Sequence, residues 1–157
     1  GCMAVDIGAQ ILALIPQQPP FRFIDRIIDV DGYQITAAYR FRVDEYFYTG
    51  HFPQHPITPG VILIETMAQA GVVALGIFYL LEKGVPAAEI TAMTTLFTYA
   101  ESVEFFGTVE PGENVIIKGE KIYFRKGSIK TQASILRENG EVVCSGVLAG
   151  TGVILDG

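Results

Sequence analysis

The first forty residues combine one short helical pattern with two strand-like patterns. Asp6 can cap a helix whose apolar side chains follow at helical spacing: Ile7, Ile11, Leu12 and Leu14. Pro16 ends this helix, and the Pro19-Pro20 pair forces an extended chain. Residues 21–30 and 33–43 have strand-like patterns on either side of the turn signal Asp31-Gly32, which predicts a β-hairpin.

Residues 60–83 are apolar at most positions rather than along one stripe. Gly84 and Pro86 end this segment, so it is predicted to be one long helix. A helix that is apolar all round must be covered by the rest of the protein. Its length also suits a membrane span, but burying a charged Glu65 in lipid would cost about 2.5–3.5 kcal/mol. We therefore expect a core helix and no membrane span.

The remaining sequence is strand-like. Strands are predicted at about 91–100, 102–106, 113–125, 128–138 and 141–155, with turn signals at Pro111-Gly112, Lys126-Gly127 and Asn139-Gly140. One long helix with about six antiparallel strands is an α+β arrangement, in which a curled sheet surrounds a helix. We expect residues 1–157 to form a single domain, with Gly1 a cloning remnant in place of an initiator methionine.

Composition narrows the functional classes. Half of the 157 residues are hydrophobic and 18% are charged, which suits a globular core and excludes intrinsic disorder. A net charge of −6 argues against a nucleic-acid surface. The two cysteines, Cys2 and Cys144, have neither zinc-site spacing nor a disulfide pattern. Together with the lack of a targeting signal, this favours a cytoplasmic protein without a metal.

Basic residues are concentrated in two windows, 22–42 and 118–137, and only Lys83 lies outside them. Such clusters could dock an acidic partner. Spacing alone favours the simpler interpretation, that they are solvated faces of strands.

Residues 50–60 form a stiff loop that leads into the long helix, since three prolines limit its backbone: Pro53, Pro56 and Pro59. The first amides of a helix have no intrahelical acceptor and carry partial positive charge. The amides near Gly60 are therefore suited to bind an oxyanion.

A potential acid and a potential base flank this helix start. Glu65 lies about one and a half turns inside the helix among apolar neighbours, and burial should raise its pKa. His51 lies just upstream, and a neutral imidazole beside a protonated carboxyl group forms a base and acid pair. Taken singly, His51 could be an ordinary loop residue and Glu65 a structural acid paired with an arginine. Their joint presence around an ordered helix start favours catalysis.

Two nearby polar residues have simpler interpretations. His55 is expected to be a surface residue of the loop. Gln69 lies four residues after Glu65, so it could orient that carboxyl group by a hydrogen bond or face a subunit contact.

The spacing in this segment is specific. Residues 50–65 read Gly-His-Phe-Pro, two variable positions, Pro, two more, Pro-Gly, and Glu five positions after that glycine; Ala68-Gln69 follow. Asp25-Arg26 precede the segment after a proline-rich lead, and a Val-Glu-Pro-Gly-Glu turn lies at 109–113. In these motifs the chain resembles the FabZ-type 3-hydroxyacyl-(acyl-carrier-protein) dehydratases, a hot-dog fold family, over about residues 6–155.

The resemblance implies a function and roles for individual residues. His51 would remove the C2 proton of a (3R)-3-hydroxyacyl thioester, and Glu65 would protonate the departing 3-hydroxyl group. The amides of Gly60 and Phe52 would bind the thioester oxygen, with Gln69 beside the substrate. No cofactor is implied, because the acyl chain arrives on a phosphopantetheine thioester. Two alternatives stay open: a hot-dog acyl thioesterase, and a non-catalytic hot-dog subunit of a biosynthetic complex.

The resemblance also implies partners, namely acyl carrier protein and a second copy of the chain. Family members form homodimers in which one subunit supplies the histidine and the other the glutamate, and these dimers commonly assemble into hexamers. The basic pair at which carrier usually docks is replaced here by Glu104 and Phe106. We therefore expect carrier to dock at a different basic set: Arg125, Lys126 and Lys130.

Overall fold

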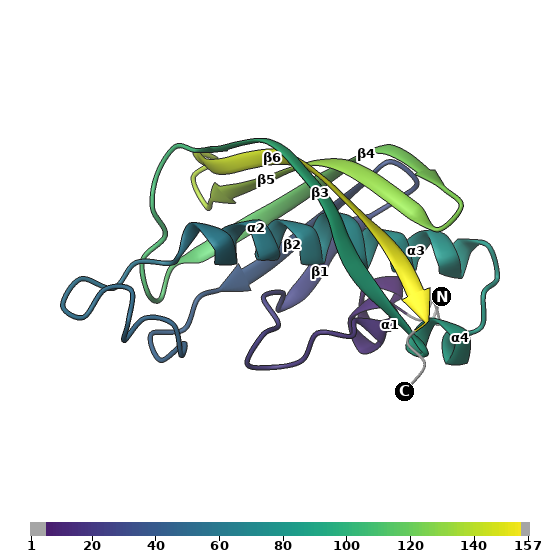
Figure 1. Cartoon of the computed structure of the whole chain (residues 1–157), viewed down its shortest axis with the longest axis horizontal. Helices are drawn as coiled ribbons and strands as arrows, with labels where there is room; N and C mark the ends of the chain where they lie inside the picture. The colour runs from purple at the N-terminus through teal and green to yellow at the C-terminus, as the bar shows by residue number, and fades with distance from the viewer. Residues whose placement is uncertain (1–5, 155–157) are drawn as a thin grey trace.

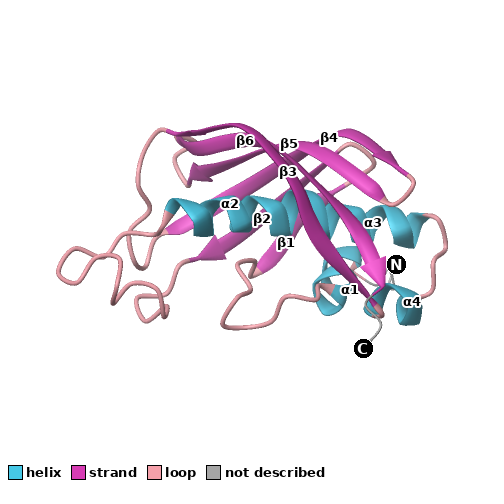
Figure 2. Cartoon of the chain, viewed as in Figure 1, coloured by secondary structure: helices cyan, strands magenta, loops and turns pink. Residues whose placement is uncertain are grey.

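A curled antiparallel sheet surrounds one long helix, which confirms the predicted α+β arrangement (Figures 1 and 2). The structure is a computed structural model that describes residues 6–154. Within this range the sheet has six strands in the order β1-β2-β4-β5-β6-β3, so β1 and β3 form its edges. The strands are β1 Arg26–Val30, β2 Gln34–Arg40, β3 Met93–Phe105, β4 Asn114–Arg125, β5 Ser128–Arg137 and β6 Val142–Ile154.

The central helix is continuous but changes its hydrogen-bonding pattern in the middle. It consists of α2 Gly60–Ala68, the π-helical η1 Gln69–Ala74 and α3 Leu75–Glu82. Residues 60–82 are apolar and long enough to cross a membrane by length and composition alone, but 78% of their most apolar window is buried inside the molecule. The helix therefore fills the core of the sheet, as the sequence predicts.

The helix lies against the sheet at glycine positions. A Cβ atom on Gly119 of β4 would lie 2.9 Å from Cα of Gly71 in η1. A Cβ atom on Gly71 would in turn lie 3.0 Å from Oγ1 of Thr131 on β5. These two glycines allow helix and sheet to meet backbone to backbone, and this contact sets how deeply the central helix lies in the sheet.

The first strand is shorter than predicted. α1 Ile7–Leu14 forms as expected, with the Asp6 carboxylate accepting a hydrogen bond from the Gly8 amide at 3.0 Å. β1 begins at Arg26 rather than at residue 21. The Phe23 amide and the Phe21 carbonyl group bond to the side chain of Gln69 instead of to a neighbouring strand.

The region after the central helix also differs from its prediction. A short helix, α4 Ala87–Thr91, begins after Pro86, which the sequence analysis treated only as a terminator. The two strands expected at 91–100 and 102–106 form one strand, β3, whose irregular pairing near Ser102 accommodates a φ of 53°. The predicted turn at Lys126-Gly127 is confirmed, with both residues at positive φ as a two-residue hairpin turn requires.

Candidate active site

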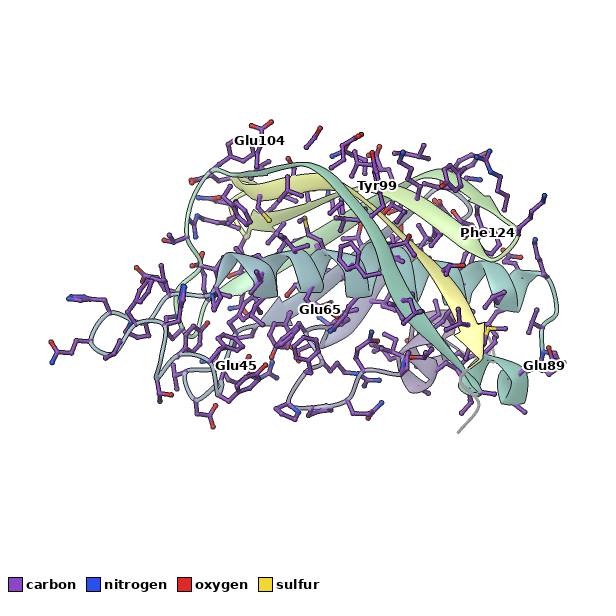
Figure 3. All side chains as sticks on the ribbon, in the orientation of Figure 1. Glu45, Glu65, Glu89, Tyr99, Glu104 and Phe124 are labelled. Carbon is purple, nitrogen blue, oxygen red and sulfur yellow. The ribbon has the colours of Figure 1, made fainter. Side chains whose placement is uncertain are left out.

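Glu65 lies on α2 and is half-buried in the middle of the molecule, whereas Glu45 and Glu104 lie at its periphery (Figure 3). Burial raises the pKa of its carboxyl group above the usual 4.5, and a hydrogen bond from Gln69 partly opposes this shift. Glu65 also lines a small cavity together with Gln17, Ala68, Val72, Val73, Thr95 and Phe97. The carboxyl group is thus placed where a protonated acid could meet a ligand.

Gln69 holds one oxygen of this carboxyl group. Its side chain is fully buried, and its Oε1 accepts a hydrogen bond from the Phe23 amide at 2.7 Å. Its Nε2 donates to the Phe21 carbonyl oxygen at 2.8 Å and to Oε2 of Glu65 at 2.9 Å. The Phe23 amide and the Phe21 carbonyl group fix the orientation of the Gln69 side-chain amide, so its Nε2 faces Glu65. Oε2 of Glu65 is therefore always the acceptor in this hydrogen bond. An acid proton on Glu65 therefore resides on Oε1.

His51 lies on the long loop between β2 and α2. Its Nδ1 lies 3.0 Å from the Ile57 carbonyl oxygen, which can only accept, so Nδ1 carries the hydrogen. The Ile57 amide donates back to the His51 carbonyl group at 3.0 Å, and the imidazole ring stacks on Phe52. This arrangement leaves the lone pair of Nε2 free to accept a proton.

The two amides expected to bind an oxyanion differ in their surroundings. Gly60 begins α2, which has no side-chain cap, so its amide has no side-chain acceptor. A Cβ atom at Gly60 would lie 3.0 Å from the ring of Phe105, so a larger residue there would displace this partly exposed ring. The Phe52 amide donates to the His55 carbonyl oxygen at 3.2 Å, and it would have to share or release that bond to serve as a second donor.

The candidate base does not line the cavity that contains the candidate acid. None of the residues that line the Glu65 cavity belongs to the loop that carries His51. In Figure 1 this loop extends beyond the start of α2, at the end of the molecule opposite α1 and α4.

An apolar cavity adjoins the Glu65 cavity. Its volume is about 90 Å³, and it lies between the central helix and strands β3, β5 and β6. The two cavities share Val72, Val73 and Thr95. An unbranched apolar chain could extend from Glu65 into this space.

Neither a metal site nor a reactive thiol is present in the described part of the chain. Residues 6–154 contain no group of three His, Cys, Asp or Glu residues able to hold a metal ion. Cys144 is buried, and burial raises its pKa to about 12, so its thiol stays protonated. Cys2 lies outside the described residues.

The predicted docking residues lie together around the β4–β5 turn. Arg125 and Lys126 are exposed, while Lys130 is half-buried with its ammonium group 4.6 Å from the centre of the Tyr99 ring. No acidic side chain among residues 6–154 forms a salt bridge with any of the three. Their positive charge is therefore available to a partner.

Gln17 lines the cavity of the candidate site, although no local sequence signal indicates it. It lies between α1 and β1, outside every motif of the long loop, and the fold alone brings it to the Glu65 cavity. Nothing in the spacing of the proline-rich lead distinguishes it from the exposed Gln18 beside it.

Comparisons with known proteins agree with this architecture. The FabA-like domain family matches residues 15–148. The 3-hydroxyacyl-(acyl-carrier-protein) dehydratase FabZ of Caldicellulosiruptor bescii is 38% identical over 140 residues, which cover 88% of this chain and 93% of the relative. FabZ of Bacillus licheniformis is 35% identical over 88% of this chain and 90% of its own.

Among solved structures, the dehydratase heterocomplex ApeI:P from Xenorhabdus doucetiae has the same fold. It superimposes with a TM-score of 0.74 over 91% of this chain and 90% of its own, at 16% sequence identity. Sequence identity and matched length together decide the family: the chain belongs to the FabA-like domain family, among the FabZ-type hot-dog dehydratases.

Proposed function

We propose that the chain dehydrates (3R)-3-hydroxyacyl groups on acyl carrier protein to trans-2-enoyl thioesters, in the biosynthesis of fatty acids or related acyl chains. As a FabZ-type dehydratase it is a hydro-lyase. The assignment of Glu65 as the acid rests on the setting of its carboxyl group. This group is half-buried, bonded through one oxygen to Gln69, and adjacent to an apolar cavity.

The proposed reaction uses one base, one acid and one oxyanion donor. Nε2 of His51 takes the C2 proton, and the electron pair moves toward the thioester oxygen, where the Gly60 amide stabilises the developing charge. The electrons then return to form the C2=C3 bond as the C3–O bond breaks. Glu65 gives its Oε1 proton to the departing hydroxyl group, which leaves as water. The chemistry requires no metal or organic cofactor beyond the phosphopantetheine arm.

We infer that a second copy of the chain completes the site. β3 is an edge strand of the described sheet, and three of its large apolar side chains are partly exposed: Leu96, Phe97 and Tyr99. Unpaired edges with large apolar side chains are suited to pair with another strand. Phe97 also lines the Glu65 cavity, so a partner docked on β3 would lie beside Glu65. The loop between β2 and α2 of that partner could then bring His51 of the partner subunit to Glu65. A hexamer of three such dimers stays a prediction from the resemblance.

We also propose the basic set Arg125, Lys126 and Lys130 as the docking surface for acyl carrier protein. The turn that carries Lys126 also lines the apolar cavity, through Gly127. A carrier held on this turn would therefore lie next to the space proposed for the acyl chain.

A reaction assay tests the function directly. Purified protein is incubated with 3-hydroxyacyl carrier protein, and intact mass analysis should show the loss of one water from the acyl group. In the reverse direction, crotonyl thioester should lose the absorbance of its conjugated double bond. Release of free thiol without either change would indicate a thioesterase, and no reaction with any acyl thioester would favour a non-catalytic subunit.

A further inference from the structure

Gln17 carries a buried polar atom that no group in the described part of the chain satisfies. Its Oε1 is shielded from solvent and has no hydrogen-bond partner among residues 6–154. Buried acceptors are nearly always paired, because an unpaired one loses its bonds to water and gains nothing in return. The Gln17 side chain lines the same cavity as the candidate catalytic acid, so its unpaired oxygen calls for a hydrogen-bond donor there, from water or from a ligand.

The position of Gln17 is well defined by its surroundings. Its carbonyl oxygen accepts a hydrogen bond from Nε of Arg22 at 3.1 Å. The same guanidinium group donates to the Leu12 carbonyl oxygen at 2.6 Å, which ties the segment to α1. The backbone that carries the Gln17 side chain is thus held in place by hydrogen bonds.

The cavity that Gln17 shares with Glu65 has room for at least one water molecule. It offers about 30 Å³ of space to the centre of a water-sized sphere. One water needs at least about 10–15 Å³ by this measure, and it needs two or more polar partners. Apart from Gln17 and Glu65, only Thr95 among the lining residues has a polar side chain.

We propose that Oε1 of Gln17 accepts the hydrogen bond of the substrate's 3-hydroxyl group, and that this cavity holds the water that the reaction forms. The inference rests on the proposed dehydration. With its O–H directed to Gln17, the hydroxyl oxygen turns its lone pairs toward Oε1 of Glu65. When the C3–O bond breaks, the Glu65 proton joins this oxygen. The resulting water then has one hydrogen on Gln17 and the other on the Glu65 carboxylate.

The opposite orientation of the Gln17 amide does not suit the reaction. A buried Nε2 would donate to one lone pair of the hydroxyl oxygen and leave the other to Glu65, but the hydroxyl hydrogen would then lack an acceptor. Glu65 itself cannot act as that acceptor through Oε2, since Gln69 occupies it. An acceptor at Gln17 is therefore complementary to a donor at Glu65.

The test compares binding of two thioesters that differ in the 3-hydroxyl group. In a Glu65→Gln background, which slows turnover strongly, Gln17→Met should weaken binding of 3-hydroxybutyryl thioester by about 3- to 10-fold, the usual effect of one lost neutral hydrogen bond. Binding of crotonyl thioester, which lacks the hydroxyl group, should change by less than about twofold. With Glu65 intact, kcat/KM for dehydration should fall by a similar factor of about 3 to 10.

Two control variants and one stability measurement make the result specific. Gln18→Met changes the exposed neighbour and should leave both affinities and kcat/KM unchanged. Thr95→Val removes the other polar side chain of the cavity and should have the smaller effect. Thermal unfolding of Gln17→Met should occur at or above the wild-type temperature, because the substitution removes an unsatisfied acceptor; Gln17→Ala replaces it if the methionine variant does not fold.

Several outcomes would overturn the inference. Unchanged affinities and kcat/KM in the Gln17 variants, equal weakening of both thioesters, or a larger effect from Thr95→Val would each exclude the assigned contact. A marked loss of thermal stability together with weaker binding of both ligands would give Gln17 a structural role instead. Failure of the wild-type protein to dehydrate or hydrate any acyl thioester would refute the proposed function itself, a result that does not depend on any Gln17 variant.

Discussion

Nε2 of Gln69 donates a hydrogen bond to Oε2 of Glu65 across 2.9 Å, at the point where α2 gives way to the π-helical segment η1. The same amide is bonded to the backbone of Phe21 and Phe23, more than forty residues earlier in the chain. One buried side chain thus connects the candidate acid to the segment that precedes β1. Gln69 determines which oxygen of Glu65 can carry a proton.

Gln69→Leu should lower the stability of the fold. The substitution leaves the Phe23 amide and the Phe21 carbonyl group without their partner, so we expect a loss of about 2–5 kcal/mol in the free energy of unfolding. Urea denaturation followed by circular dichroism measures it. Gln132→Leu on β5 is the matched control, since that glutamine is exposed and donates only one long hydrogen bond, to the Gly146 carbonyl oxygen at 3.3 Å, and it should cost less than about 1 kcal/mol. Equal losses in the two variants would contradict the anchoring role.

Glu65→Gln should nearly abolish dehydration while leaving the fold intact. The amide has almost the same shape, and its oxygen can still accept the bond from Gln69, but it cannot deliver a proton. Loss of a general acid typically lowers the rate by about 10²–10⁴-fold. Single-turnover assays with carrier-bound substrate measure this loss, and binding of the substrate should change little. Turnover near the wild-type rate would remove Glu65 from the mechanism.

The same variant should change how stability depends on pH. Burial raises the pKa of Glu65 in the folded state, so the contribution of this group to stability is greatest below about pH 4.5 and is lost as pH rises through the folded-state pKa. Glu65→Gln has no such ionisation. Its stability relative to the wild-type protein should therefore improve between pH 4 and neutrality, as urea titrations at several pH values would reveal. A difference independent of pH would mean that the carboxyl group ionises as freely when folded as when unfolded.

His51→Ala should lower dehydration by about 10²–10⁴-fold, the usual cost of removing a general base. The side chain makes one hydrogen bond, to Ile57, and one stacking contact, to Phe52, so its removal should leave the fold intact. His55→Ala is the matched control: it lies on the same loop, is exposed and should keep full activity. Equal activities of the two variants would exclude His51 as the base.

Mixing the two inactive variants tests whether the site is shared between subunits. A heterodimer of His51→Ala and Glu65→Gln chains contains one site with both native residues only if each site draws on two chains. Random assembly should then restore about a quarter of wild-type activity, because half of the dimers have one of two sites intact. Co-expression of differently tagged chains supplies the mixture. No recovery in purified heterodimers would place both groups of a site in one chain.

Local signals were enough to predict most of the fold. The turn at Asp31-Gly32, the long helix and its end at Gly84 depend on residues close together in sequence, and each forms as predicted. The loop motif likewise identified His51 and Glu65 as candidates, because the spacing of its prolines and glycines is itself a local feature.

What the sequence could not reveal depends on long-range contacts. β1 begins at Arg26 because the Gln69 side chain, rather than a neighbouring strand, bonds to the backbone of Phe21 and Phe23. No local sequence pattern encodes these two hydrogen bonds. The π-helical segment has the same apolar side chains as the α-helix around it. Gln17 reaches the Glu65 cavity only through the packing of the segment after α1.

Charge reversal tests the proposed docking surface for the carrier. Arg125, Lys126 and Lys130 are replaced together by glutamate, which should lower kcat/KM for carrier-bound substrate by about 10-fold or more at low salt, because electrostatic attraction mainly speeds encounter. Activity on a small soluble thioester should be retained. The difference between the two substrates should shrink as salt rises above about 0.15 M, where the screening length falls below about 8 Å.

The control for this experiment is Lys118→Glu, which reverses an exposed charge on β4 away from the turn and should affect both substrates little. Equal loss on both substrates in the triple variant would mean that the basic set supports the fold, since Lys130 contacts the Tyr99 ring. Full activity on both substrates would mean that carrier docks elsewhere. Selective loss that disappears in high salt is the result that only a docking role for these three residues explains.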